Sequence, residues 1–236
     1  MSKNTIFEKT SPIKKHDVKM IVEIVKSLLP NQLKNNLILD IGSARFKSES
    51  NDLDLFLDEQ SVKDYFNTTD TSSAKKSLEN YFRDKRLRTK LISRNIHVSI
   101  KYPTVLSNFE DMAYAQVDVM VIPNAKKVAE WHQHGLRGMY SDPNFRANHL
   151  YILLNSIGKY LGYKVDAFGG VVMRRDNNEI VADNREDAAK LLLNQNATAN
   201  DLNSVSTVMK ALEHDVHRED KLQQAYCDVE KGLLVL

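Results

Sequence analysis

Two aspartates separated by one residue, Asp52 and Asp54, are the side chains whose types and spacing most directly indicate chemistry. They alternate with leucines at positions 53, 55 and 57. Successive side chains of a β-strand point to opposite faces, so a strand here would place both carboxylates on one face and the leucines on the other. Paired carboxylates repel each other unless a cation lies between them, which predicts a divalent metal site. Carboxylate and water oxygens suit Mg²⁺.

The turn before these acids has the composition of a phosphate-binding loop. An apolar stretch that begins at Leu37 is expected to form a strand, and Gly42 and Ser43 follow it. Glycine lets the backbone approach a phosphate closely, and serine offers a hydroxyl and an N–H group. The loop and the paired acids therefore predict a site for a phosphorylated ligand and its metal ion.

This order of strand, Gly-Ser turn, short loop and Asp-x-Asp strand resembles the DNA polymerase β-like nucleotidyltransferase superfamily. That superfamily has a third carboxylate on a later strand, and residues 116–123 offer Asp118 in an otherwise apolar run. The three-part match is more specific than Asp-x-Asp alone and covers roughly residues 20–125. It implies an α+β fold with a nucleotidyltransferase-like mixed β-sheet backed by helices.

The resemblance implies a metal-dependent nucleotidyltransferase, which moves a nucleoside monophosphate from an NTP to a hydroxyl acceptor and releases pyrophosphate. Asp52, Asp54 and Asp118 would be its catalytic residues and its ligands for Mg²⁺ or Mn²⁺. The acceptor is left open among RNA, protein and a small molecule. The overall layout also resembles uncharacterised nucleotidyltransferase-like proteins encoded by bacteriophages.

The resemblance also implies nucleotide-binding residues in the loop. Gly42 and Ser43 would hold the β- and γ-phosphates, and Arg45 or Lys47 would add positive charge there. In a solvated loop, Arg45 and Lys47 would have no role, and the sequence favours neither interpretation.

Two alternatives come from other classes of protein. The first is a catalytically inactive nucleotidyltransferase fold with a binding or regulatory role, against which the presence of all three acids argues. The second is a nucleic-acid-binding protein that uses the densest group of cations in the chain. This basic cluster consists of Arg83, Lys85, Arg86, Arg88, Lys90 and Arg94. No aromatic residues are interleaved there to stack bases, and a solvated helix end explains the cluster more simply.

Hydrophobic periodicity predicts the elements that position these residues. Apolar side chains recur at helical spacing over residues 14–29, and Pro30 ends that helix. A second helix is expected to end near residue 85, and residues 91–102 alternate as one strand that carries His97. A lone histidine on a strand is usually structural. A further helix is expected to begin at Ala125.

Gly135, Gly138 and Pro143 predict a boundary or hinge over residues 135–143. We therefore expect a catalytic domain over residues 1–138 and a mainly helical module over residues 139–236. The module is expected to contain a helix over 145–163, a β-hairpin near 168–182, a helix capped by Asn184, a helix from 201 and a helix over 215–231. Its sequence indicates no chemistry.

Histidines that lie near each other in the sequence suggest two further metal sites, and neither is favoured. His132 and His134 would point in widely different directions on a helix, so packing or surface roles are favoured. His214 and His217 could share a helix face, but their charged neighbours favour a solvated surface.

The composition is that of an ordinary folded chain. The 236 residues are 42% hydrophobic and 27% charged, with a net charge of +2. Nucleic-acid contacts would therefore need local patches of positive charge.

A single cysteine, Cys227, excludes an internal disulfide and a cysteine-based zinc site. No apolar run is long enough to span a membrane, and the amino terminus lacks the apolar core of a signal peptide. A cytoplasmic protein without a membrane partner is expected, and its oligomeric state is left open.

Overall fold

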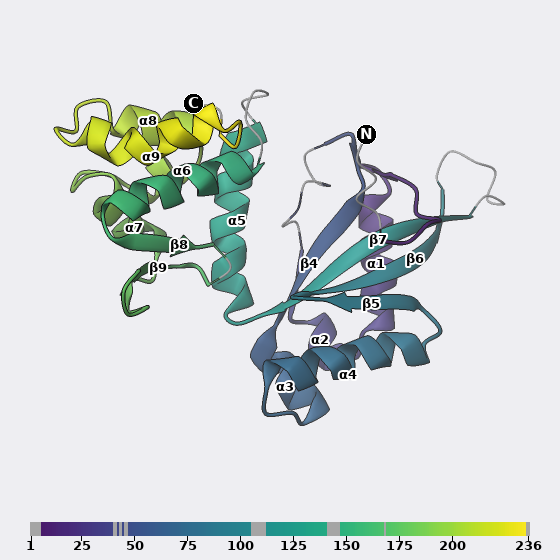
Figure 1. Ribbon diagram of the computed structural model, residues 1–236. Helices are drawn as coiled ribbons and strands as arrows, with labels where there is room; N and C mark the ends of the chain where they lie inside the picture. Colours follow the sequence, from purple (N-terminus) through teal and green to yellow (C-terminus); the bar gives the residue numbers. More distant parts are fainter. Residues whose placement is uncertain are drawn as a thin grey trace. The chain divides into compact units, whose positions relative to one another are not determined.

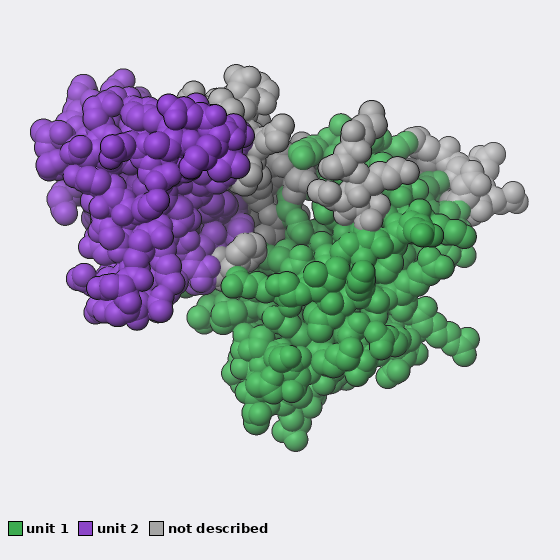
Figure 2. Space-filling view, in the orientation of Figure 1, with its two compact units in different colours: residues 1–129 green, residues 130–236 purple. Residues whose placement is uncertain are grey.

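A computed structural model describes residues 6–39, 42, 44, 47–104, 112–140, 147–167 and 169–234, with side chains omitted for 133–140, 147 and 148 (Figure 1). The chain divides into two compact units, residues 1–129 and residues 130–236 (Figure 2). The division after residue 129 and the predicted domain boundary after residue 138 both fall inside one helix, α5 (Ala125–Tyr140). Among the described residues, no helix is long and apolar enough to cross a membrane.

The first unit is built on a mixed five-stranded β-sheet with the order β2-β4-β7-β6-β5. Its strands are β2 (Leu37–Ile38), β4 (Asp52–Asp58), β5 (Arg88–Ile92), β6 (Asn95–Pro103) and β7 (Met112–Ile122). Strands β4 and β7 run parallel, and the other neighbours are antiparallel. A separate short pair joins β1 (Ile13–Lys14) to β3 (Glu49–Ser50). The predicted α+β class, with a mixed sheet backed by helices, is confirmed.

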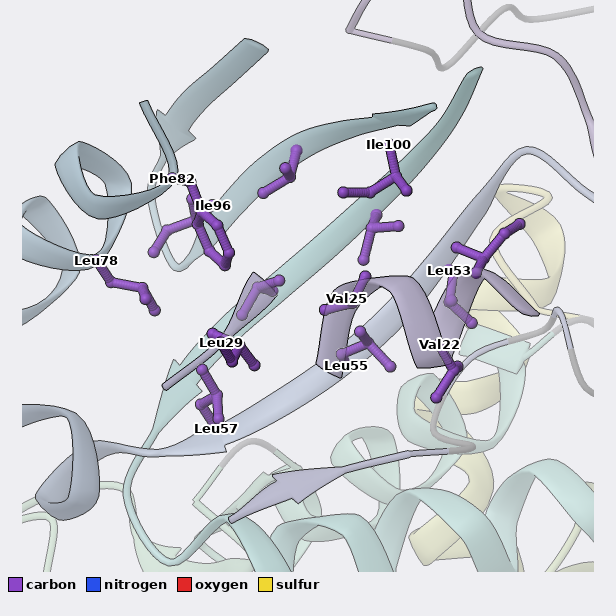
Figure 3. Packing of buried hydrophobic residues seen from close by; sticks show 14 of the residues in the cluster. Val22, Val25, Leu29, Leu53, Leu55, Leu57, Leu78, Phe82, Ile96 and Ile100 are labelled. Carbon is purple, nitrogen blue, oxygen red and sulfur yellow. The ribbon is translucent and has the colours of Figure 1, made fainter. Parts of the chain in front are cut away.

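In the described part of this unit, the sheet is accompanied by the helices α1 (Val18–Leu28), α2 (Asn31–Lys34), α3 (Glu59–Phe66) and α4 (Thr71–Asp84). Figure 3 shows Val22 and Val25 of α1 packed toward Leu53 and Leu55 of β4. The leucines of β4 are at most 3% exposed, which confirms their predicted place in the core. Because side chains alternate along a strand, their burial assigns the acids of β4 to the other face.

The prediction of a single strand over residues 91–102 is wrong. The segment contains two antiparallel strands, and Ile92 at the end of β5 pairs with Asn95 at the start of β6. Ser93 takes the left-handed conformation, with φ at 55°, so the chain reverses there. Strand β5 is the edge strand of the sheet. Arg88 and Lys90 of the basic cluster lie on β5, and Arg94 lies in the turn that follows it.

The second unit contains most of α5, which begins in the first unit, and a three-stranded antiparallel sheet of order β10-β9-β8. Its other elements are α6 (Ala147–Tyr160), β8 (Tyr163–Asp166), β9 (Val171–Arg174), β10 (Ile180–Ala182), α7 (Arg185–Leu192), the 3-10 helix η2 (Ala199–Leu202), α8 (Val205–Ala211) and α9 (Arg218–Glu230). The predicted hairpin is confirmed as β9 and β10, and Asn184 caps α7 by accepting a hydrogen bond from the Asp187 N–H at 2.9 Å.

Several predicted ends in this unit are wrong. The helix expected to reach residue 163 ends at Tyr160, because Gly162 adopts a φ of +79° and the chain turns into β8. The helix expected from residue 201 is interrupted, because Ser204 caps a new helix, α8, through the Thr207 N–H. Gly135 and Gly138, expected in a hinge, lie within α5, and Pro143 lies outside the described residues.

Candidate active site

The pairing of β4 with β7 brings the three predicted acids together. In the parallel register, Asp54 is the partner of Asp118, and Asp52 is the partner of Gln116. The core-facing residues between them are Leu53, Leu55, Val117 and Val119, all buried. All three carboxylates therefore project from the face of the sheet opposite this core.

The acids influence one another's protonation. Burial first, and then the nearby carboxylates of Asp52 and Asp118, raise the pKa of Asp54 to about 7. Burial and then Asp118 also raise the pKa of Asp52, whereas Lys47 and His97 lower it. The carboxylates are therefore poorly solvated and repel one another. A cation bound between them would offset that repulsion.

Gly42 lies directly against one of these acids. A Cβ atom at Gly42 would lie 2.2 Å from Oδ2 of Asp54 and 2.9 Å from its Cγ, so no larger residue fits without displacing the carboxylate. The backbone at Gly42 thus lies against the acids. Lys47 is exposed and acts on Asp52 through its charge. Ser43 and Arg45 lie outside the described residues.

Asp118 is held by two buried side chains that the sequence did not assign to the site. Nδ1 of His97 lies 2.7 Å from Oδ1 of Asp118, and Nε2 of Gln116 donates to the same oxygen at 3.1 Å. The N–H of Ile6 in turn donates to Oε1 of Gln116 at 2.8 Å. Gln116 lies two residues before Asp118 on the same strand and shares its face. His97 becomes a neighbour of Asp118 only through the sheet order.

The donors fit a divalent ion that is shared with a substrate. Within the described part of the chain, no three or more His, Cys, Asp or Glu side chains are grouped so as to hold a metal ion by themselves. Mg²⁺ usually takes one or two protein carboxylates and completes its shell with water and phosphate oxygens. Hard carboxylate donors, the raised pKa values and the Gly42 cradle agree with that mode. Asp52, Asp54 and Asp118 are the carboxylates from which such a shared ion could draw its protein ligands.

The other candidate residues belong to other elements, and the described ones contact other partners. The ring of His132 lies 5.5 Å from that of Tyr151 within the second unit. The side chain of His134 lies outside the described set. His217 is exposed beside Asp220. In the basic cluster, Arg83 pairs with Glu79 at 2.8 Å.

No protein-family model matches the chain, and no curated protein matches its sequence. Function is therefore inferred from the residues of the site and their arrangement.

Proposed function

We propose that this protein is a metal-dependent nucleotidyltransferase, which transfers a nucleoside monophosphate from an NTP to a hydroxyl acceptor. The observation that supports this proposal most strongly is the register of β4 and β7. It sets Asp54 beside Asp118, with Asp52 one pleat away on the same face. The motif resemblance adds to this support, because its Gly-Ser turn supplies the glycine that lies against Asp54.

In the proposed reaction, the acceptor oxygen attacks the α-phosphorus of the NTP. The bond from that phosphorus to the bridging oxygen breaks, and pyrophosphate leaves with the electron pair. The proton of the acceptor hydroxyl passes to Asp118, which His97 and Gln116 hold in place. Divalent ions, when bound, would neutralise charge on the triphosphate and lower the pKa of the acceptor hydroxyl.

The chain also supplies groups for binding the nucleotide. Gly42 lets the loop backbone come close to the acids, where phosphate oxygens would share the metal ion. Lys47 adds positive charge beside Asp52 and would balance the triphosphate. Substrate binding would thus relieve the repulsion that adds to burial in raising the pKa values of Asp52 and Asp54.

The test is a transfer assay with each of four α-labelled NTPs, Mg²⁺ or Mn²⁺, and a cell extract that supplies acceptors. Label should enter RNA, protein or a small molecule with the wild-type protein. Asp54→Asn should lower the rate at least about 100-fold, because one carboxylate ligand is lost. Asp84→Asn makes the same chemical change at an exposed helical position and should keep the wild-type rate.

Two results would overturn this proposal. One is transfer by Asp54→Asn at the wild-type rate, because the acid would then have no catalytic role. The other is a wild-type protein that binds nucleotide and transfers none, which would favour a regulatory module.

A further inference from the structure

The register that aligns the acids continues across the sheet to its far edge. Asp118 pairs with His97 of β6, and His97 pairs with Lys90 of β5. Directly paired residues project from the same face of a sheet. Lys90 therefore lies on the face that carries Asp118, two strands away, or roughly 10 Å at the usual strand spacing.

Two neighbouring rows add further cations to this face. Gln116 pairs with Ser99, and Ser99 pairs with Arg88 on the edge strand. One pleat further along β6, Lys101 pairs with Tyr114. Because side chains alternate with a period of two, these rows share the face of the acids.

The three cations on this face are available to a ligand. Arg88, Lys90 and Lys101 are exposed. Among the residues that the structure describes, none of the three forms an ion pair with an acid. Within that described set, no acid neutralises their charge, whereas Arg83 is paired with Glu79.

Tyr114 adds an aromatic surface to these cations. Its side chain is 36% exposed, although it belongs to a strand that is mostly buried. Exposed aromatic rings stack on nucleic-acid bases, and neighbouring cations contact the phosphates. The basic cluster lacked such a residue in the sequence, and the pairing of Lys101 with Tyr114 supplies it from another strand.

We propose that Arg88, Lys90, Lys101 and Tyr114 form a binding surface for a single-stranded nucleic acid. This inference rests on the proposed function and names its acceptor: the strand lies over the cations, and its terminal hydroxyl reaches Asp118. Between the exposed residues and the acids, His97 and Ser99 are buried. Contacts to the strand therefore come from the four exposed side chains, which we call the edge surface.

The experiment measures binding of the full chain to fluorescent oligouridylate and oligothymidylate by fluorescence anisotropy over a series of salt concentrations. Each phosphate contact to a single strand contributes about 0.7 to the slope of log K against log salt. Arg88→Ala/Lys90→Ala should therefore lower that slope by about 1.4. The matched control, Lys19→Ala/Lys34→Ala, removes two exposed charges from α1 and α2 and should leave the slope unchanged.

The stacking role of Tyr114 needs its own pair of variants. Tyr114→Ala should weaken binding by about five-fold or more, because a base–aromatic stack is lost. Tyr114→Phe keeps the ring and should bind within about two-fold of wild type. Circular dichroism of each variant checks that the fold is retained. Preference for the ribose or the deoxyribose strand identifies which nucleic acid the surface takes, and either preference supports the surface.

The outcomes separate this inference from the transferase proposal. Binding that depends on the edge surface, without any nucleotidyl transfer, keeps the surface and overturns the transferase. Transfer into protein with no oligonucleotide binding keeps the transferase and overturns the surface. Oligonucleotide binding that is equal in wild type and in all edge-surface variants also overturns the surface.

Discussion

His97 and Asp118 face each other across the β6–β7 ladder, with Nδ1 of the imidazole 2.7 Å from Oδ1 of the carboxylate. Both residues are at most 6% exposed. Gln116 donates to the same oxygen, so two hydrogen bonds fix the orientation of Asp118. His97 is therefore a positioning residue in the proposed reaction, because it acts on the substrate only through Asp118.

Removing the imidazole should slow the reaction without much change in nucleotide binding. His97→Leu fills the buried position with an apolar side chain and removes the hydrogen bond to Asp118. We expect kcat to fall about 10- to 100-fold, as for other residues that orient metal-binding carboxylates, while KM for the NTP stays within about two-fold. Steady-state transfer kinetics measure both quantities.

A conservative variant separates positioning from packing. In His97→Asn, the new side-chain amide can reach Asp118 from nearly the place of Nδ1, so this variant should recover much of the lost kcat. Wild-type kcat in His97→Leu, or equal losses in the two variants, would contradict the positioning role.

A methyl group at Gly42 should disable the site and leave the fold nearly intact. In Gly42→Ala, the new Cβ would lie 2.2 Å from Oδ2 of Asp54, so the carboxylate or the loop must move. A shift of about 1 Å at a reacting group lowers rates by about 100-fold. The transfer assay checks the rate, and thermal unfolding checks the fold. A Gly42→Ala protein of normal activity would show that the loop is not held against Asp54.

Repulsion among the acids predicts opposite effects of Asp54→Asn on stability without and with Mg²⁺. Without metal, the variant should unfold at a higher temperature than wild type near pH 8, because a poorly solvated carboxylate beside Asp52 and Asp118 is removed. With Mg²⁺, the wild type should gain stability as ligand occupancy rises, and the variant should gain much less. Thermal unfolding with and without Mg²⁺ tests both effects. Equal gains in the two proteins would exclude Asp54 as a ligand.

The sequence predicted those features of the fold that depend on local patterns. Alternating leucines identified β4 and its buried face, and helical spacing identified α1. Turn-forming residues identified the β9–β10 hairpin, and Asn184 identified the start of α7. Each of these signals is contained within a few consecutive residues, where side-chain periodicity and backbone preference act directly.

The rest depended on which strands are neighbours. His97 was placed on a strand face, but its contact with Asp118 requires β6 to lie beside β7. Tyr114 lies outside the basic cluster in sequence and joins Lys101 only through the same ladder. The turn at Ser93 was missed because a single serine in the left-handed conformation leaves little trace in an alternating pattern. Local periodicity predicts the face of the strand on which a side chain lies. The side chains that it contacts on other strands depend on which strands pair.

His132 in the second unit predicts a loss of stability in mild acid. Burial lowers its pKa to about 4, although a backbone hydrogen bond with Ala167 raises it. Between the ordinary value of 6.5 and that pKa, the unfolded chain takes up a proton that the folded chain does not. The free energy of unfolding should therefore fall by on the order of 3 kcal/mol as the pH drops through this range, and no such loss occurs above it.

His132→Gln should remove that part of the pH dependence, whereas His217→Gln, at an exposed position, should not. Urea unfolding near neutral pH and near the folded pKa measures the difference, and equal pH dependence in wild type and His132→Gln would contradict it.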